Sequence, residues 1–198
     1  MKQKYRVFLA NKNKKLKKIY LQFKTDSIPV IKMKQSHSNN IQKIIHPPTK
    51  QLTSITNTDA VYTSLPNIAL TVKFADCMPL IIHHPKKIAC VIHAGRVGTQ
   101  KKIVKKTLQK LISELNTTEN YEIYIGAHLC KQCHEINSEK KIHYNLYNEN
   151  LLQIKSVLNL TKNSLKTNNE CTKCGTNFYS YRGDKKTKKR NFLFCMIS

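Results

Sequence analysis

Two apolar runs near the middle of the chain constrain the fold more than any other feature of the sequence. Residues 79–83 and 88–93 are almost continuously apolar, and residues 68–72 form a third strand-like segment shortly before them. Continuous runs of this length are typical of β-strands that are buried on both faces. We therefore expect a sheet whose two faces are both covered by other parts of the chain.

The hydrophobic period changes after His93. Four apolar residues are spaced by four, three and four positions, which places them on one side of a helix: Val104, Leu108, Leu111 and Leu115. We expect a second helix over residues 146–158 and further strands over residues 5–9, 19–23, 28–33, 41–45, 121–125 and 192–197. This pattern predicts an α/β fold, a mixed sheet with helices on its faces, in a single domain of residues 1–198.

Composition indicates a globular protein without a membrane anchor. Hydrophobic residues make up 40% of the 198 residues, which is enough for a core. The longest apolar run in mid-chain, residues 78–82, is far shorter than a bilayer span, and residues 7–10 are too short for a signal-peptide core. We therefore expect a cytoplasmic protein with no membrane partner, whose seven cysteines bind metal or react rather than form disulfides.

The formal net charge is +24, and lysines cluster over residues 12–18, 101–110 and 185–190. One interpretation is a binding face for nucleic acid or another polyanion. The other is a lysine-rich composition spread over solvated faces. No nucleic-acid-binding motif accompanies the charge, so we favour the second interpretation; attraction of phosphate-bearing substrates is compatible with both.

Three segments carry side chains that can ligate a metal ion: His37, Cys77 and His93. Two imidazoles and one thiolate would give a tetrahedral zinc ion three protein ligands and leave one position open. That number of ligands is typical of catalytic rather than structural zinc sites. The spacing alone is weak evidence, because an isolated cysteine is more often a small core residue.

Six sequence blocks between residues 35 and 184 resemble, in order, the motifs of the laccase-domain family. Residues 72–80 (VKFADCMPL) and 91–99 (VIHAGRVGT) resemble the motifs T-A-D-C-x-P and H-A-G-W-R-G-T. The remaining blocks are QSHS at 35–38, DAV at 59–61, IGA with CHEI within 125–136, and CT with FYSYRGD within 171–184. They are similar to Q-V-H-G, D-A-x-V/L, I-G-P…C-Y-E-V and C-T…F-F-S-Y-R-R-D, whereas residues 1–34 match poorly.

The resemblance implies both a fold and a function. Members of this family are named polyphenol oxidases, peptidoglycan editing factors and purine nucleoside phosphorylases with adenosine deaminase activity. A zinc site at His37, Cys77 and His93 is implied, with copper as the alternative metal, and a fold shared with bacterial deamidating toxins. The implied substrates are adenosine, inosine and methylthioadenosine, with inorganic phosphate.

Residues beside the ligands have candidate roles in that chemistry. Asp76 would stabilise positive charge on the sugar or protonate the purine; alternatively, its carboxylate positions the Cys77 loop, as is common around metals. Arg96 is the nearest cation for phosphate, and the alternative is a solvated loop residue. Gln35 and Arg182 lie in matching motifs and are expected to bind substrate. A metal-activated water would attack C6 of adenine in deamination.

The sequence departs from the family pattern next to the expected ligands. The family's Trp-Arg pair is Arg96-Val97 here, so an aromatic side chain is missing and the arginine is displaced by one position. The paired arginines near the C-terminus are reduced to Arg182-Gly183, and T-G-R is replaced by TKK at residues 187–189. Lysine does not provide planar bidentate recognition. The metal ligands are thus retained while the substrate-facing residues are altered.

Two C-x-x-C pairs predict a second metal site if their loops meet: Cys130 with Cys133, and Cys171 with Cys174. Paired thiolates from two tight turns are a structural zinc pattern, and the alternative is four separate surface thiols. The other cysteines, Cys90 and Cys195, lie in strand-like runs and are expected in the core. We expect five other histidines at the surface or behind the ligands: His83, His84, His128, His134 and His143.

Three other functions are compatible with the sequence. A cysteine hydrolase or amidase would use Cys77 as nucleophile and His93 as base. A copper-dependent polyphenol oxidase is a poorer match, because one three-ligand site is unsuited to the four-electron reduction of oxygen. A non-enzymatic polyanion binder would owe its affinity to charge and lose it with added salt. The oligomeric state is left open.

Overall fold

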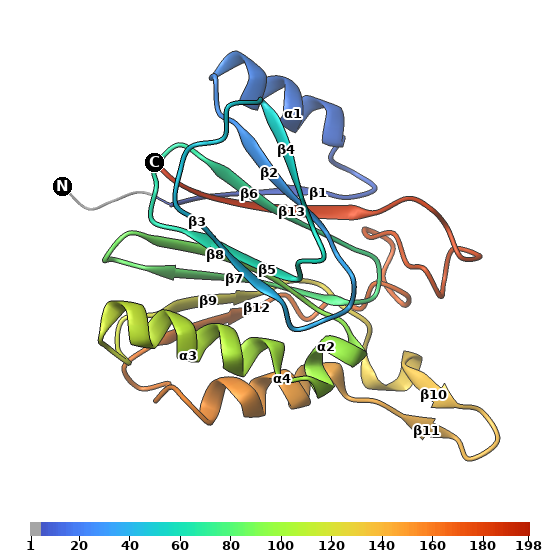
Figure 1. The fold of residues 1–198 in the computed structure, drawn as a ribbon. Helices are drawn as coiled ribbons and strands as arrows, with labels where there is room; N and C mark the ends of the chain where they lie inside the picture. The colour runs from blue at the N-terminus through green and yellow to red at the C-terminus, as the bar shows by residue number, and fades with distance from the viewer. Residues whose placement is uncertain (1–4) are drawn as a thin grey trace.

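The computed structural model describes residues 5–198, which form two stacked β-sheets between helices (Figure 1). The first sheet has the order β1-β13-β6-β2-β4, with β1 (Tyr5–Ala10), β2 (Val30–Lys34), β4 (Leu52–Thr56), β6 (Ala69–Phe74) and β13 (Asn191–Ile197). The second has the order β12-β9-β7-β8-β5-β3, with β3 (Ile41–Ile44), β5 (Ala60–Thr63), β7 (Met78–His84), β8 (Ile88–Ala94), β9 (Glu122–Ile125) and β12 (Ser164–Thr167). Both sheets contain parallel and antiparallel pairs.

Helices cover the outer faces of the two sheets (Figure 1). α1 (Leu16–Thr25) packs on the first sheet, while α3 (Ile103–Leu115) and α4 (Leu146–Lys155) pack on the second. The short α2 (Arg96–Gln100) follows β8, and η1 (Lys131–Cys133) leads into the hairpin of β10 (Glu135–Asn137) and β11 (Ile142–His143). The predicted α/β class, with mixed strands and helices on the sheet faces, is confirmed. The expectation of one sheet was incomplete, because the described residues form two large mixed sheets and the small two-stranded sheet of β10 and β11.

Packing on both faces of the central hairpin β7–β8 explains why its sequence is continuously apolar. Leu80 and Ile82 belong to the cluster packed under α3 and α4, whereas Ile81 belongs to the cluster between the two sheets. Val91 lies on the same inter-sheet side of β8, two residues before His93. Both faces of these strands are therefore covered, as the sequence predicts, and His93 lies on the side of β8 that faces the other sheet.

The prediction of a strand over residues 19–23 was wrong, because these residues belong to α1. Ile19 and Phe23 are four positions apart and face the first sheet from the same side of the helix. Phe23 is fully buried, and its ring packs edge-on against Phe8 and Phe194 at centroid distances of 5.0 and 5.4 Å. The apolar spacing in this segment was helical, and the β-branched and aromatic residues in it disguised that.

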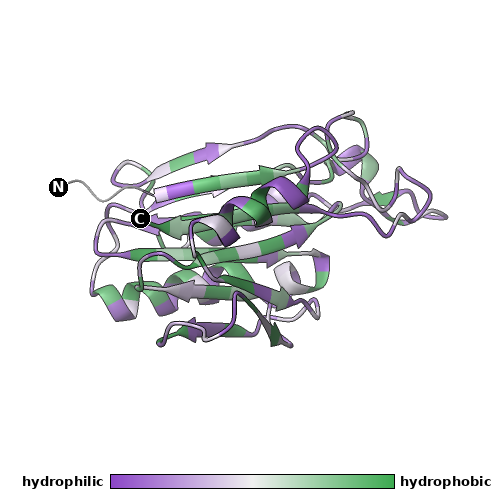
Figure 2. Cartoon of the chain, turned by 90° about the horizontal axis from the view of Figure 1, so that it is seen from above, coloured by the Kyte–Doolittle hydropathy of each residue, from purple (hydrophilic) through white to green (hydrophobic). Residues whose placement is uncertain are grey.

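His83 and His84 were expected at the surface or behind the metal ligands, but both are buried at the end of β7 and bond other groups. The His83 ring stacks on Tyr5 with a centroid distance of 4.0 Å, and its Nε2 lies 2.9 Å from the Cys195 sulfur. Burial lowers the pKa of His83 to about 4, so the ring is neutral at physiological pH. Figure 2 shows the wider pattern: hydrophobic residues concentrate in the strands, while the long loops at one end are mainly hydrophilic.

Candidate metal centre and adjoining cavity

His37, Cys77 and His93 meet at one end of the two sheets. His37 follows β2 in the first sheet, Cys77 immediately precedes β7, and His93 is near the end of β8 in the second sheet. One ligand atom from each residue lies within 4.8 Å of the others. The Cys77 sulfur is 3.9 Å from His37 Nε2, and the two imidazole rings are 4.9 Å apart at an angle of 79°. Side chains far apart in sequence thus converge on one point.

The three side chains differ in their access to solvent. His93 is buried, Cys77 is half-buried and His37 is exposed. A metal ion held by the three would therefore be enclosed on the His93 side and accessible on the His37 side. That asymmetry suits a centre with one open coordination position, which is how catalytic zinc sites differ from closed structural ones.

Asp59 organises the centre from behind. Its Oδ1 accepts a hydrogen bond from His93 Nδ1 at 2.8 Å, which leaves Nε2 of that ring for a metal. The same carboxylate accepts the backbone N–H groups of Ser36, His37 and Ser38 at 3.2, 3.1 and 2.8 Å. These bonds hold His37 in a left-handed conformation with φ of 59°, so a single buried carboxylate orients both histidines.

The protonation of these groups follows from their contacts. Burial would raise the pKa of Asp59, but hydrogen bonds from His93 and Ser38 hold it well below its ordinary value. Burial also acts to raise the pKa of Cys77, but the charge of His93 and hydrogen bonds from both histidines lower it to about 6. Burial acts to lower the pKa of His93, yet the Cys77 charge and the Asp59 hydrogen bond raise it to about 9. The surroundings favour the thiolate, the form of cysteine that binds metal.

Gly95 allows the backbone to pass close to all three side chains. A Cβ atom at this position would lie 2.9 Å from the Cys77 sulfur, 3.0 Å from His37 Cδ2 and 3.7 Å from His93 Cε1. Any side chain here would push against two of the three ligands. The absence of a side chain at Gly95 therefore allows the backbone to approach the metal centre itself.

Asp76 connects the Cys77 loop to the C-terminal segment. Its buried carboxylate accepts hydrogen bonds from the Thr172 and Ser180 hydroxyls at 2.8 and 2.6 Å, and from the Arg182 backbone N–H at 2.8 Å. All of these donors come from protein groups about 100 positions later in the chain. This arrangement agrees with the positioning role that was one of the two interpretations of Asp76.

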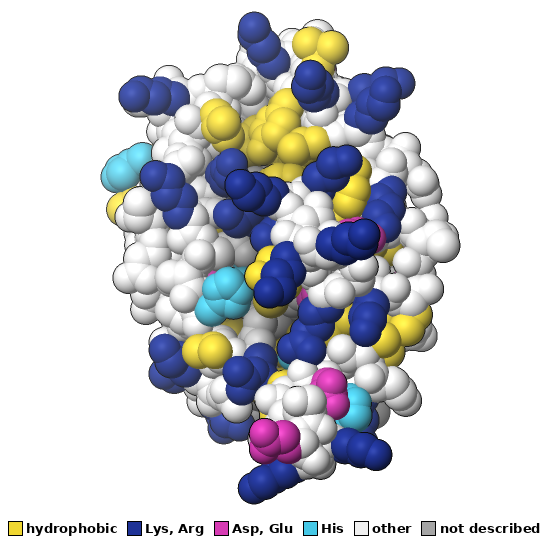
Figure 3. Space-filling model, turned by 90° about the vertical axis from the view of Figure 1, so that its right-hand side faces the viewer, with side chains coloured by type: hydrophobic (Ala, Val, Ile, Leu, Met, Phe, Trp, Pro, Cys, Tyr) yellow, Lys and Arg dark blue, Asp and Glu magenta, His cyan; other side chains and the backbone are white. Residues whose placement is uncertain are grey.

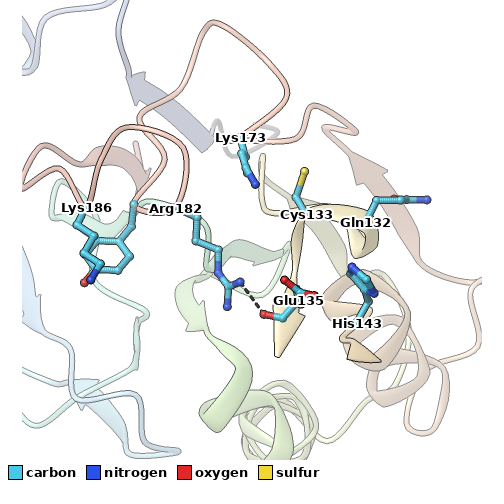
Figure 4. Close-up of a pocket in the computed structure, with 8 residues that line it drawn as sticks. Gln132, Cys133, Glu135, His143, Lys173, Arg182 and Lys186 are labelled. Carbon is cyan, nitrogen blue, oxygen red and sulfur yellow. Dashed lines mark hydrogen bonds between the residues drawn. The ribbon is translucent and has the colours of Figure 1, made fainter. Parts of the chain in front are cut away.

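An open cavity of about 350 Å³ lies along that C-terminal segment (Figure 4). Its lining includes Lys173, Arg182 and Lys186, and the Arg182 guanidinium donates to the Glu135 carbonyl oxygen at 2.6 Å. The three metal ligands do not line this cavity. Its connection to them runs through Asp76, which binds the Arg182 backbone and adjoins Cys77. Three cationic side chains in one cavity suit an anionic ligand.

His134 is buried next to this cavity. In the chain it stands between Cys133 and Glu135, which both line the cavity. Within residues 5–198, its Nδ1 is the buried side-chain nitrogen or oxygen that lacks a hydrogen-bond partner. Burial, followed by the charges of Arg182 and Arg96, lowers the pKa of His134 to about 4. The neutral ring therefore carries a buried hydrogen-bonding atom without a partner in this part of the chain.

The other predicted site residues lie in different surroundings. Arg96 is exposed at the start of α2, close enough to His134 to affect its pKa. Gln35 bonds the backbone of Lys73 with both ends of its amide, at 2.9 and 3.1 Å, so its side chain joins β2 to β6 and is not among the residues lining the cavity. Asp59 was present in the sequence motif at residues 59–61, but its role depends on contacts that the motif does not reveal.

Comparison of the sequence with family models identifies the family to which the chain belongs. A family model described as multi-copper polyphenol oxidoreductase laccase matches residues 9–145. The chain belongs to this family. The match includes His37, Asp59, Cys77 and His93, whereas the segment that carries Arg182 lies beyond it.

Relatives of this laccase-family chain carry the names of enzymes. A purine nucleoside phosphorylase of Clostridium acetobutylicum is 31% identical over 180 residues, which is 82% of this chain and 74% of that protein. The adenosine deaminase RL5, from an unknown prokaryotic organism, is 30% identical over 103 residues, or 49% of this chain and 39% of that protein. The crystal structure of Bacillus licheniformis YfiH, a hypothetical protein, superposes with a TM-score of 0.79 at 22% identity, covering 92% of this chain and 79% of that one.

The laccase-family chain brings its four C-x-x-C cysteines together as well. Ligand atoms of Cys130, Cys133, Cys171 and Cys174 lie within 4.8 Å of one another. Of the three cysteines outside this cluster, Cys77 belongs to the first centre, and Cys90 and Cys195 are buried in the core as expected. No helix in residues 5–198 is long and apolar enough to cross a bilayer.

Proposed function

We propose that the chain is a zinc-dependent purine nucleoside phosphorylase with adenosine deaminase activity. Its substrates would be adenosine, inosine and methylthioadenosine with inorganic phosphate, and its products the free base and a ribose 1-phosphate. The observation that carries this proposal is the convergence of His37, Cys77 and His93 on one point with an exposed side. Relatives named purine nucleoside phosphorylase and adenosine deaminase give the reaction type.

The donor set fits a zinc ion. His37, Cys77 and His93 would hold it, with Asp59 fixing the His93 ring so that Nε2 is the free nitrogen. When bound, zinc would supply Lewis acidity and a water of lowered pKa at the open position. Gly95 keeps the space in front of the ligands free of a side chain.

The cavity residues would bind and orient the substrates. Lys173, Arg182 and Lys186 provide positive charge for phosphate. Asp76 holds the segment that carries Arg182 against the Cys77 loop, so it positions the cavity relative to the metal centre.

We propose small molecules, nucleoside and phosphate, as the partners rather than nucleic acid. In Figure 3 the lysine and arginine side chains are distributed over the whole face of the molecule, with hydrophobic side chains between them. A nucleic-acid interface would more commonly gather its charge into one stripe or patch.

The experiment is metal analysis by mass spectrometry combined with turnover of adenosine and phosphate, on wild type and His93→Ala. We expect about one zinc per chain at this centre, product formation as ribose 1-phosphate or inosine, and loss of both in His93→Ala. His46→Ala, at an exposed histidine outside both the centre and the cavity, is the matched control and should keep its zinc and its turnover. Zinc without turnover of any purine nucleoside would contradict the proposed substrates, and bound copper with phenol oxidation would favour the oxidase.

A cysteine hydrolase is the second candidate, because Cys77 lies beside two histidines as a nucleophile would. Alkylation of metal-free wild type separates the two. If Cys77 is alkylated and purine turnover persists after zinc is restored, Cys77 is neither a required zinc ligand nor the nucleophile. If hydrolysis of amide or ester substrates proceeds with no metal present and stops on alkylation, the hydrolase is favoured.

A further inference from the structure

The four cysteines outside the His37 centre come from two segments that are far apart in sequence. Cys130 and Cys133 lie in the loop after β9, where Cys130 precedes η1 and Cys133 is its last residue. Cys171 and Cys174 lie in a turn at the start of the C-terminal segment. The Cys133 and Cys174 sulfurs are 3.1 Å apart, and those of Cys130 and Cys174 are 4.0 Å apart. A zinc ion bound tetrahedrally at about 2.3 Å separates its sulfurs by about 3.8 Å, so the cluster needs only small shifts to hold one.

The backbone around the cluster has the form of two tight turns. The Cys133 N–H bonds the Cys130 carbonyl at 3.2 Å, and the Gly175 N–H bonds the Cys171 carbonyl at 2.8 Å. The N–H of Cys130 also points at the Cys171 sulfur, at 3.3 Å, and the nearby backbone N–H groups of Lys173 and Cys174 favour the charged form of this sulfur. Donors of this kind stabilise a thiolate, and the thiolate is the form of cysteine that binds metal.

A disulfide explains this cluster less well than a metal. In a disulfide each sulfur is bonded to a single partner at about 2.05 Å, whereas the Cys174 sulfur lies 3.1 and 4.0 Å from those of Cys133 and Cys130 and all four sulfurs converge. Four thiolates also leave no open position on a tetrahedral ion, which is the arrangement of a structural rather than a catalytic site. We propose that Cys130, Cys133, Cys171 and Cys174 bind a structural zinc ion that fastens the C-terminal segment to the loop after β9.

The position of this second site gives it an effect on the cavity. Cys133 and Lys173 both line the cavity, and Thr172, between two of the ligands, donates to the Asp76 carboxylate. The Thr172 N–H also bonds the His128 carbonyl at 3.2 Å. Zinc at the four cysteines would therefore hold one wall of the cavity in place and, through Asp76, hold that wall against the loop of the first centre.

The test is zinc content and zinc K-edge absorption on protein purified under reducing conditions, for Cys77→Ser and Cys174→Ser. Cys77→Ser removes a ligand of the first centre only, so we expect it to keep about one zinc per chain with four sulfur ligands. Cys174→Ser should lose that sulfur-coordinated zinc and keep any zinc of the first centre. Each site is counted in the absence of the other, so failure of one proposal is distinguishable from failure of the other.

Two further measurements keep the result clear if a variant folds poorly. In Cys77→Ser, iodoacetamide should label the four cysteines slowly until a chelator is added, even though Cys174 is exposed. Hydrogen exchange over residues 171–186 should be faster in Cys174→Ser than in wild type, while exchange in β7 and β8 should not change. The proposal is overturned if Cys77→Ser holds no zinc, or if its intact mass is lower by two hydrogen atoms because a disulfide has formed.

Discussion

At the scale of single residues, Asp59 has the largest predicted influence on the metal centre although it is not a ligand. Asp59→Asn preserves the size of the side chain but removes the charge that orients His93. We expect the zinc affinity to fall by about 10- to 100-fold, the range found when partners behind metal ligands are changed. Competition with a chromophoric chelator measures this affinity. Asp184→Asn, in the C-terminal segment, is the control, and an equal loss in both variants would contradict the specific role of Asp59.

The lowered pKa of Asp59 also predicts that the free energy of unfolding depends on pH. The pKa of Asp59 is lower in the folded protein than its ordinary value of 3.8, so its ionised form stabilises the fold above that pH. This contribution is lost as the pH falls below 3.8. Denaturant unfolding of metal-free protein should therefore show a steeper loss of stability in acid for wild type than for Asp59→Asn. If the free energy of unfolding falls equally steeply in acid for both proteins, the contacts of Asp59 do not stabilise its ionised carboxylate.

Gly95 tests how closely the backbone must approach the ligands. In Gly95→Ala the new Cβ would be 2.9 Å from the Cys77 sulfur and 3.0 Å from His37, so at least one ligand must move. We expect zinc affinity to fall at least tenfold, with turnover falling in parallel. Phe23→Ala is a control, because it removes a fully buried side chain between α1 and the first sheet, away from the ligands. It should lower stability while leaving zinc affinity unchanged; the reverse pattern would argue against the crowding at Gly95.

At the scale of elements, α1 provides a test of the corrected assignment for residues 19–23. Phe23 is fully buried between α1 and the first sheet, so Phe23→Ala should lower the free energy of unfolding by about 3–5 kcal/mol. Leu21, two positions earlier, is 65% exposed, and Leu21→Ala should change stability by less than about 0.5 kcal/mol. Urea unfolding of both variants measures the difference. If the two variants lose the same free energy of unfolding, residues 19–23 behave as a strand packed on both faces and not as a helix packed on one face.

The elements that could be predicted were those with strong periodic patterns. Residues 79–83 and 88–93 fixed the buried hairpin, and the stripe from Val104 to Leu115 fixed α3. Short strands such as β4 and β12 were missed because they alternate between exposed and half-buried positions and carry few large apolar residues. The presence of two sheets was not visible either, since a strand covered by a second sheet reads the same as one covered by a helix.

The ligands of the centre were found through their motifs, but the groups behind them were not assigned. Asp59 stood within a recognised block and still had no predicted role, because its function depends on hydrogen bonds to His93 and to the 36–38 turn of the other sheet. The four cysteines were identified by their C-x-x-C spacing, and two of them, Cys133 and Cys171, also stood in recognised blocks. Whether the two pairs meet depends on how the β9 loop and the C-terminal segment pack, which no local pattern encodes.

At the scale of the whole molecule, the net charge of +24 is the property that most affects encounter with substrates. A field of one sign concentrates anions near the protein and raises their association rates. Phosphate would be attracted, whereas an uncharged nucleoside would not. The cations that line the cavity, Lys173, Arg182 and Lys186, should contribute most, since charges beyond about 10 Å are largely screened at 0.1 M salt.

We therefore expect the KM for phosphate to rise several-fold as KCl increases from about 0.05 to about 0.5 M, while the KM for adenosine stays constant. Lys173→Glu/Lys186→Glu should raise the KM for phosphate and weaken its salt dependence. Lys86→Glu/Lys87→Glu changes the same charge in the turn at the far end of the seven-residue β7, about 20 Å from Cys77 at roughly 3.3 Å per residue. This control should stay within about twofold of wild type because of screening. If both pairs have the same effect, the total charge rather than the cavity attracts phosphate; if neither has any, phosphate binds elsewhere.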